Sequence, residues 1–295
     1  MKRPLIGFIG QGYVGKHTAD AIENLGNAVI RYALEESYLG NKDRVQECDI
    51  VFICVPTPTT KKGFDVSIVE NALSLVGIGK IAVIKSTILP GTTKMLQKKF
   101  SKLFIMHAPE FLVTAKAKDG AEKPDRNIIG IPKMTPAYSE RAKRVLAVLP
   151  PAPFARIVSS EDAEVAKYGA NFFLYLKVIY ANLMYEVADS VDADYDNVRE
   201  IIGADERIGH SHLQIRHNSG HKDARSGRGA GGMCFIKDSE ALRRFYTEKV
   251  RNPHGAKMLD AIIKKNIDLL VASGKDIDLL TSTYGAAVAK KKKRR

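Results

Sequence analysis

This chain of 295 residues has no tryptophan, few cysteines and no long apolar run. Its three cysteines, Cys48, Cys54 and Cys234, are an odd number without disulfide-like spacing. That excludes a disulfide-stabilised secreted scaffold and indicates a reducing compartment. No stretch of about 18 apolar residues occurs, and Gly7 and Gly10 interrupt the apolar run near the N-terminus, so neither a membrane-spanning helix nor a signal peptide is predicted. We therefore expect a soluble, cytoplasmic protein.

Acidic residues are too few to balance the basic ones. The chain has 33 Asp and Glu residues and 46 Lys and Arg residues, which gives a formal net charge of +13. Six of the basic residues form the segment 290–295, and removing them leaves +7. We expect residues 286–295 to be a disordered tail. Three roles of this tail stay open: a solvated end, a nuclear signal or an RNA contact. The remaining excess suits a phosphorylated small molecule as well as a nucleic acid.

A glycine pattern follows the first apolar run. Residues 5–9 predict a strand, residues 10–15 read G-Q-G-Y-V-G, and a helical pattern begins at Lys16. Gly10 permits the tight turn, Gly12 lets the backbone approach a pyrophosphate, and Gly15 lets the helix pack on the strand. The helix N-terminus favours the negative charge of that pyrophosphate. The pattern predicts dinucleotide binding.

The second predicted strand, residues 28–32, does not end in the acid that usually binds the adenosine ribose. Ala33 stands at that place and Glu35 follows it, so the ribose contact is displaced or lost. Arg31 leaves NADP open, but we expect NAD.

Further strands are predicted at 49–55, 81–85, 104–106 and 128–131. Thr57 follows the first of these and Thr87 the second. Because the carboxyl ends of parallel strands line one crevice, both hydroxyls should face the dinucleotide. The alternation of strands and helices predicts a doubly wound parallel sheet.

The pattern becomes helical after about residue 159, with helices expected at 161–189, 195–202, 240–249 and 257–273. The first of these is apolar nearly all round, which indicates burial against other helices or in a homodimer. Lys167 and Asn171 lie four residues apart on it and share one face. We expect a dinucleotide-binding domain at 1–155 and an all-helical dimerisation domain at 156–285.

A second glycine-rich stretch, residues 227–238, carries four glycines within six residues and then Cys234, Lys237 and Asp238. Such a backbone can take positive φ and approach a ligand closely. A cysteine beside a lysine is typical of a thiolate nucleophile presented from a loop. By itself, however, a cysteine is as often a small, inert apolar residue.

Together the motifs resemble the UDP-glucose/GDP-mannose dehydrogenase family, which oxidises the C6 hydroxyl of a nucleotide sugar to a carboxylate. The resemblance implies a Rossmann-like NAD-binding domain, a helical dimerisation domain and a four-electron oxidation with two NAD⁺. It rests on these ordered motifs: 10–15, 55–59, 86–87, 109–112, 124–126, Ala163-Glu164 with Lys167 and Asn171, Asp205 with Arg207, and 229–238.

The resemblance also implies the role of each site residue. Cys234 would form a thiohemiacetal and then a thioester, while Lys167 and Asn171 stabilise the oxyanion. Asp238, Glu110 and Thr87 would order or activate the water, and Arg207 would reach the nucleotide sugar across the dimer interface. The residues assigned to NAD are Gly10, Gly12, Tyr13, Val14, Gly15, Glu35, Thr57, Thr87 and Lys237. Those assigned to the nucleotide sugar are Glu110, Phe111, Leu112, Lys167, Asn171, Arg207 and Gly231.

Several positions depart from the family pattern: besides Ala33, these are Thr114, Leu183 and Ala230. The chain also ends where the family's third, nucleotide-sugar-binding domain would begin, so a separate chain is an expected partner. The stretch between Arg207 and Cys234 is longer than the corresponding stretch of the family. Four histidines in this stretch, His210, His212, His217 and His221, have no recurring ligand spacing, so no metal site is predicted.

Two other functions stay open. A two-electron hydroxyacid dehydrogenase of similar layout would use Lys167 and Asn171 without a thiol. A non-catalytic dimeric protein would keep the helices and use its basic tail for nucleic acid. Retention of Cys234 and Asp238 beside those two residues favours the nucleotide-sugar dehydrogenase.

Overall fold

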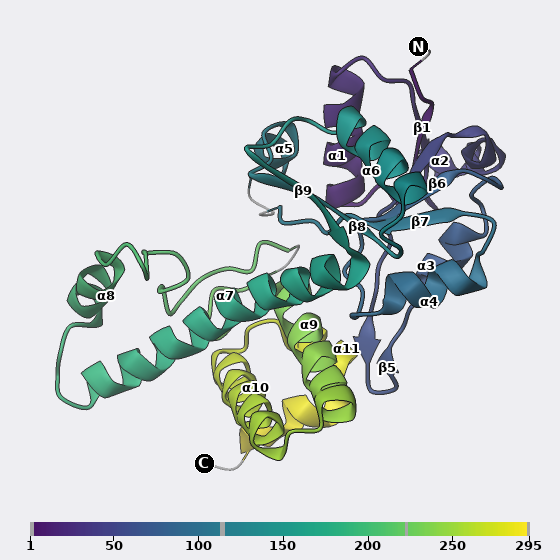
Figure 1. Cartoon of the computed structure of the whole chain (residues 1–295). Helices are drawn as coiled ribbons and strands as arrows, with labels where there is room; N and C mark the ends of the chain where they lie inside the picture. The colour runs from purple at the N-terminus through teal and green to yellow at the C-terminus, as the bar shows by residue number, and fades with distance from the viewer. Residues whose placement is uncertain (1–2, 113–115, 222–223, 294–295) are drawn as a thin grey trace. The chain divides into compact units, whose positions relative to one another are not determined.

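The computed structural model describes residues 3–112, 116–221 and 224–293, so the expectation for Thr114 lies outside the described residues. The chain divides into two compact units (Figure 1). Unit 1 comprises Met1–Thr57 and Asp65–Lys167, and unit 2 comprises Pro58–Phe64 and Tyr168–Arg295. The division near the predicted boundary after residue 155 therefore falls at Lys167, inside a helix, and a short earlier segment joins unit 2.

Unit 1 is built on a seven-stranded sheet in the order β2-β1-β3-β6-β7-β8-β9. The predicted doubly wound sheet is confirmed, because β1 pairs in parallel with β2 on one side and β3 on the other. One pair that the sequence did not indicate, β7 with β8, is antiparallel. The strands are β1 (Ile6–Ile9), β2 (Val29–Tyr32), β3 (Ile50–Ile53), β6 (Ile81–Ile84), β7 (Phe104–His107), β8 (Arg126–Ile131) and β9 (Phe154–Ser159), the last of which was not predicted.

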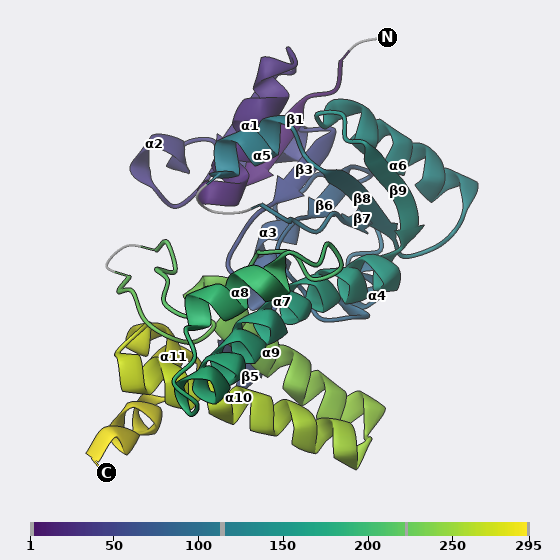
Figure 2. The same cartoon turned by 90° about the vertical axis from the view of Figure 1, so that its left-hand side faces the viewer.

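Helices cover both faces of this sheet, α1, α5 and α6 on one face and α3 and α4 on the other (Figures 1 and 2). Phe8 and Phe52 stack in the core at 5.0 Å between ring centroids. Ile22 of α1 and Val145 of α6 belong to the same buried cluster. The helices are α1 (Tyr13–Asn24), α2 (Glu36–Leu39), η1 (Lys42–Glu47), α3 (Ser67–Leu73), α4 (Thr92–Lys99), α5 (Ala117–Glu122) and α6 (Pro136–Val148).

Unit 2 is mainly helical, as expected, but it also contains the small hairpin of β4 (Thr59–Thr60) and β5 (Gly63–Phe64). Its longest helix, α7 (Ser160–Asp189), starts in unit 1 and matches the prediction closely. The remaining helical elements are α8 (Tyr195–Gly203), α9 (Gly232–Phe245), the π-helical η3 (Tyr246–Val250), α10 (Pro253–Ser273), α11 (Ile277–Tyr284) and η4 (Ala286–Lys293).

Two expectations for unit 2 are corrected. Helix α9 begins at Gly232, eight residues before the predicted start, so Cys234 lies in a first helical turn and not in a loop. The segment expected to be a disordered tail begins with η4, and Val288 packs against the cluster that contains Leu270 and Leu280. Within the described part of the chain, no helix has the length and apolar character needed to cross a membrane.

Candidate functional site

The first glycine turn joins β1 to α1 and is shaped by close backbone contacts. Gly10 has φ of +92°, and a Cβ there would lie 2.4 Å from the carbonyl oxygen of Cys54. A Cβ on Gly15 would lie 2.0 Å from the carbonyl oxygen of Gly10. Both positions therefore require glycine, because any side chain would collide with backbone.

Gly12 differs from the other two glycines of this turn. Its φ of −64° is open to any residue, and no described atom lies within 4 Å of a Cβ built on it. Gly12 precedes the first residue of α1, Tyr13, and no side-chain hydrogen bond caps the helix among the described residues. Open space beside uncapped helical N–H groups fits the pyrophosphate of a dinucleotide.

The end of β2 shows how the missing ribose acid is accommodated. Ala33 is buried and Glu35 is exposed, as the residue that precedes α2. Arg31 is held by α1, since its guanidinium pairs with Asp20 at 2.7 Å and also with Glu23. Burial lowers the pKa of Arg31, but these two carboxylates outweigh burial and raise it. Arg31 is thus already neutralised by carboxylates of the chain, which does not favour a 2′-phosphate.

Hydroxyl groups link the ends of β3 and β6. The Thr57 hydroxyl is buried and donates to the carbonyl oxygen of Thr87 at 2.8 Å. Ser86 donates to the carbonyl oxygen of Val55 at 2.7 Å. The two predicted threonines therefore do lie together at the carboxyl edge of the sheet, where a doubly wound fold places its ligand.

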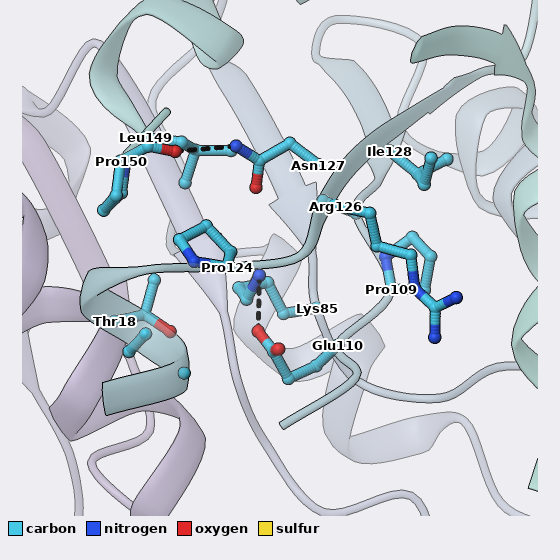
Figure 3. Close-up of a pocket in the computed structure, with 13 residues that line it drawn as sticks. Thr18, Lys85, Pro109, Glu110, Pro124, Arg126, Asn127, Ile128, Leu149 and Pro150 are labelled. Carbon is cyan, nitrogen blue, oxygen red and sulfur yellow. Dashed lines mark hydrogen bonds and ion pairs between the residues drawn. The ribbon is translucent and has the colours of Figure 1, made fainter. Parts of the chain in front are cut away.

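An ion pair follows these strands, between the buried Lys85 at the end of β6 and the partly buried Glu110 after β7 (Figure 3). Lys85 Nζ lies 2.8 Å from Glu110 Oε2, while Glu110 Oε1 accepts the amides of Phe111 and Leu112 at 2.8 and 3.1 Å. Burial would raise the pKa of Glu110, but Lys85, the Phe111 amide and Lys167 outweigh it and hold the pKa below its usual value. Glu110 is consequently an anion at neutral pH.

Sequence reasoning did not single out Lys85. The pattern predicts it only as the last residue of an apolar strand, directly before the Ser86-Thr87 motif. A lysine at the end of an otherwise fully apolar strand was the available signal, because such a cation needs a buried partner. The partner, Glu110, was predicted as a site residue from the resemblance to the family.

Two cationic side chains, one from β8 and one from α7, lie over the Phe111 ring. Arg126, at the start of β8, lies with its guanidinium carbon 3.8 Å from the ring centroid, and Lys167 Nζ lies 5.2 Å from it. Both are cation–π distances. Lys167 is 8% exposed. Unit 1 therefore gathers the predicted residues Glu110, Phe111 and Lys167 around one cationic cluster.

His107, the last residue of β7, is fully buried. Its Nδ1 is 2.9 Å from the carbonyl oxygen of Ile84. Burial, with smaller contributions from the charges of Lys85 and Lys167, lowers the pKa of His107 to about 3. The imidazole is therefore neutral at physiological pH.

Glu164, a residue of the quoted motifs, has a structural task. Its buried carboxylate accepts the amides of Gly91 and Thr93 at 2.6 and 2.8 Å and the Thr93 hydroxyl at 2.6 Å. It thereby caps the N-terminus of α4 from a distant part of the chain. Burial raises the pKa of Glu164 although these hydrogen bonds oppose the rise.

Unit 2 gathers the predicted residues around Asp238, which is 3% exposed. Asn171 Nδ2 donates to Asp238 Oδ2 at 2.8 Å, and Lys237 Nζ donates to Asp238 Oδ1 at 2.6 Å. Burial lowers the pKa of Lys237, but the charges of Asp238 and Cys234 outweigh burial and raise it. Cys234, Lys237 and Asp238 occupy successive turns of α9, so a thiol, a cation and a carboxylate are combined on one helix.

Other predicted residues of unit 2 lie outside this cluster. Arg207 is 88% exposed and pairs with Asp205 at 2.6 Å. Gly231 directly precedes α9. His210 and His221 approach different carboxylates, those of Glu200 and Asp276, both at 3.7 Å. In the described residues no three His, Cys, Asp or Glu side chains come together as metal ligands would.

Ala230, which stands where the family has an aromatic residue, is fully buried in a cluster with Tyr175 and Leu269. Its amide donates to Asn266 Oδ1 at 2.7 Å, and its carbonyl accepts from Asn266 Nδ2 at 2.9 Å. One asparagine of α10 thus fixes both polar groups of the loop residue. A small side chain suits the site because Tyr175 fills the adjoining volume.

Two domains of one known protein family match successive parts of the chain. Residues 35–149 match the NAD binding domain of the UDP-glucose/GDP-mannose dehydrogenase family, and residues 161–268 match the central domain of that family. The putative UDP-glucose 6-dehydrogenase YtcA of Bacillus subtilis is 29% identical over 243 residues, covering 78% of this chain and 52% of YtcA. UDP-glucose 6-dehydrogenase TuaD of the same organism is 28% identical over 307 residues, covering 88% and 62%. The chain thus spans between half and two thirds of the length of these relatives.

Solved structures of dehydrogenases have folds similar to that of this chain. A UDP-glucose dehydrogenase from Pyrobaculum islandicum superposes with a TM-score of 0.76 at 25% identity, over 92% of this chain and 70% of that one. The 3-hydroxyisobutyrate dehydrogenase of Mycobacterium tuberculosis gives 0.65 at 15% identity, over 99% and 100%, which shows a shared fold alone. Because both domain matches are to one family and together cover most of the chain, the chain belongs to the UDP-glucose/GDP-mannose dehydrogenase family and carries its NAD-binding domain.

Proposed function

We propose that the chain oxidises the C6 hydroxyl of a nucleotide sugar to a carboxylate, with NAD⁺ as acceptor and Cys234 as nucleophile. The observation that carries this proposal is the arrangement on α9, where Lys237 and Asp238 follow Cys234 by about one turn and Asn171 donates to Asp238. A thiol in the first turn of a helix and near a lysine is favoured as thiolate by both the helix N-terminus and the cation.

The reaction balances as two oxidations and one hydrolysis. In the first oxidation the C6 hydroxyl loses a proton and C6 loses a hydride, giving an aldehyde. The Cys234 thiolate then adds to the aldehyde carbon and forms a C–S bond. Loss of a second hydride from that carbon gives a thioester, and attack by water breaks the C–S bond and releases the acid and the thiolate. Bound NAD⁺ accepts the hydride in each oxidation.

The site residues have suitable chemistry for these steps. Lys167 and Asn171, four residues apart on α7, can donate to the oxygen that becomes negative when the thiolate adds. Lys237 favours the thiolate, and the buried Asp238 carboxylate orders the hydrolytic water. In unit 1, Thr87 is assigned to holding that water near the cofactor. Glu110 is better suited to orienting groups than to deprotonating water, because Lys85 holds it as a weakly basic anion.

We further propose that the chain forms a homodimer through α7. Apolar side chains at intervals of seven residues, Phe173, Tyr180 and Val187, are 61, 41 and 57% exposed. Such a stripe is typical of a helix that packs on a partner. Arg207, which extends into solvent, would then contact the nucleotide sugar bound by the other subunit.

The dimer is tested by sedimentation at micromolar concentration. A dimer is expected for the parent and a monomer for Tyr180→Glu with Val187→Glu, because two charges would have to be buried at the interface. A parent that sediments as a monomer would contradict the proposal. Arg207→Ala should weaken binding of the nucleotide sugar without affecting NAD⁺.

The reaction is tested with NAD⁺ and a panel of UDP- and GDP-sugars. The parent should form two NADH for each sugar acid, whereas Cys234→Ser should lower acid formation by at least a thousandfold and still bind NAD⁺. Iodoacetamide should alkylate Cys234 faster than the buried Cys48, whose pKa burial raises to about 11. One NADH for each substrate and a fully active serine variant would instead support a two-electron dehydrogenase. All three cysteines lie in described residues, and none forms a disulfide.

A further inference from the structure

Two consecutive charged residues, Lys275 and Asp276, are buried between α10 and α11. Lys275 is 0% and Asp276 4% exposed. Asp276 also has a left-handed backbone with φ of +52°. A buried cation, a buried anion and a left-handed residue are each costly, and they persist only where the surrounding structure holds them. The proposed reaction assigns no role to either residue.

Each residue of this pair makes a hydrogen bond to the glycine loop, residues 227–232. Lys275 Nζ donates to the carbonyl oxygen of Gly229 at 3.0 Å. Asp276 Oδ2 accepts the amide of Gly232, the first residue of α9, at 2.7 Å. The same oxygen accepts the Ser219 hydroxyl at 2.5 Å, and His221 Nε2 lies 3.7 Å from Oδ1. The carboxylate therefore caps the helix whose third residue is Cys234.

The glycines of the loop fit closely around the same pair. A Cβ on Gly231 would lie 1.9 Å from Asp276 Oδ2, and a Cβ on Gly227 would lie 2.8 Å from Lys275 Cβ. Gly229 and Gly232 have positive φ, of +94° and +84°. The close backbone approach expected from this stretch is thus made to the chain's own lysine and aspartate.

We propose that Lys275 and Asp276 are positioning residues that fix the glycine loop and the first turn of α9, and thereby set the direction of the Cys234 thiol. The proposal rests on the proposed role of Cys234. Lys275 anchors the loop at Gly229 and Asp276 anchors it at Gly232, two residues before Cys234, so the segment that leads to the thiol is held at two points. Neither residue touches the reacting atoms in this scheme.

Asp276→Ala tests the proposal, with Asp278→Ala as a matched control because Asp278 is exposed two residues further along α11. Hydrogen exchange followed by mass spectrometry should accelerate at least about tenfold in peptides covering residues 227–236, since Gly232 loses its acceptor. The kcat should fall at least tenfold while NAD⁺ affinity stays at the parent value. Asp278→Ala should change neither.

Asp276→Asn should restore most of the protection from exchange and of kcat, because an amide oxygen can still accept from Gly232. Should Asp276→Ala fail to fold, Ser219→Ala removes one hydrogen bond to the same carboxylate and should accelerate exchange about threefold. Parent-like exchange in a folded Asp276→Ala, or faster exchange with parent-like kcat, would overturn the proposal. An inactive parent would contradict the proposed function instead. In that case the readout in place of kcat is the alkylation rate of Cys234 relative to that of Cys48. We expect this ratio to change at least threefold in Asp276→Ala.

Discussion

The two glycine-rich turns of the chain look alike in sequence but serve opposite purposes. In the first turn, the central Gly12 has an ordinary φ, and no described atom is near the position of its missing side chain. In the second turn, Gly231 is in contact with the buried Asp276. Gly12 keeps space open in the first turn, whereas Gly231 makes room for the protein's own charged residues in the second.

The difference shows that a glycine pattern alone does not state what the backbone approaches. A close approach to a ligand leaves open space around the glycine, whereas a close approach to the chain itself leaves none. Mutating one glycine of each turn therefore separates binding from stability.

The largest effect is expected for Gly12→Val. Its side chain would occupy the space assigned to the pyrophosphate, so NAD⁺ affinity should fall at least a hundredfold, or about 3 kcal/mol. The free energy of unfolding should stay near that of the parent, because no described atom is within 4 Å of the new Cβ. Calorimetric titration and denaturant unfolding measure the two quantities. Parent-like affinity would place the dinucleotide elsewhere.

Gly231→Ala should show the reverse pattern. Its Cβ would lie 1.9 Å from Asp276 Oδ2, so the loop or the lysine–aspartate pair must shift. We expect a loss of about 2–3 kcal/mol in the free energy of unfolding, as for other overpacked sites. Gly12→Ala is the matched control and should lose less than about 1 kcal/mol. Equal stability of the two variants would show that the second turn is as open as the first.

A smaller effect, on pH dependence, distinguishes the buried bases of the two units. Burial lowers the pKa of His107 to about 3 and that of Lys275 to about 8. In both cases the unfolded chain binds the extra proton, so stability falls as pH decreases through the window between the ordinary and the lowered pKa. For His107 that window is from about 6.5 down to 3, and for Lys275 from about 10.5 down to 8.

His107→Asn should therefore reduce the acid sensitivity of the protein. Between pH 6 and pH 4.5 the parent should lose up to about 1.4 kcal/mol per pH unit more than the variant, the value for one proton. Denaturant unfolding at several pH values measures this difference. Identical slopes for parent and variant would show that His107 takes up its proton in the folded state as readily as in the unfolded chain.

Much of unit 1 could be predicted because its signals are local. The apolar runs predicted six of the seven sheet strands within about two residues of their observed bounds, and the first glycine pattern predicted the turn from β1 to α1. Strand β9 was missed because Arg156 interrupts its apolar run, and the structure leaves its residues exposed or only partly buried. In unit 2, the start of α9 was missed because four glycines in six residues indicate a loop.

The candidate site divides in the same way. Sequence alone predicted the residues that are proposed to carry the chemistry, since Cys234, Lys237 and Asp238 are close in the chain and Lys167 and Asn171 share a helix. Only the tertiary structure decided their partners. It showed that Lys85 holds Glu110 as an anion, that Asn171 donates to Asp238, and that Lys275 and Asp276 support the second glycine turn. The physical reason is that these hydrogen bonds and ion pairs join residues 25 to 67 positions apart in the sequence. Such contacts form only when the tertiary fold brings the residues together, so local sequence patterns do not predict them.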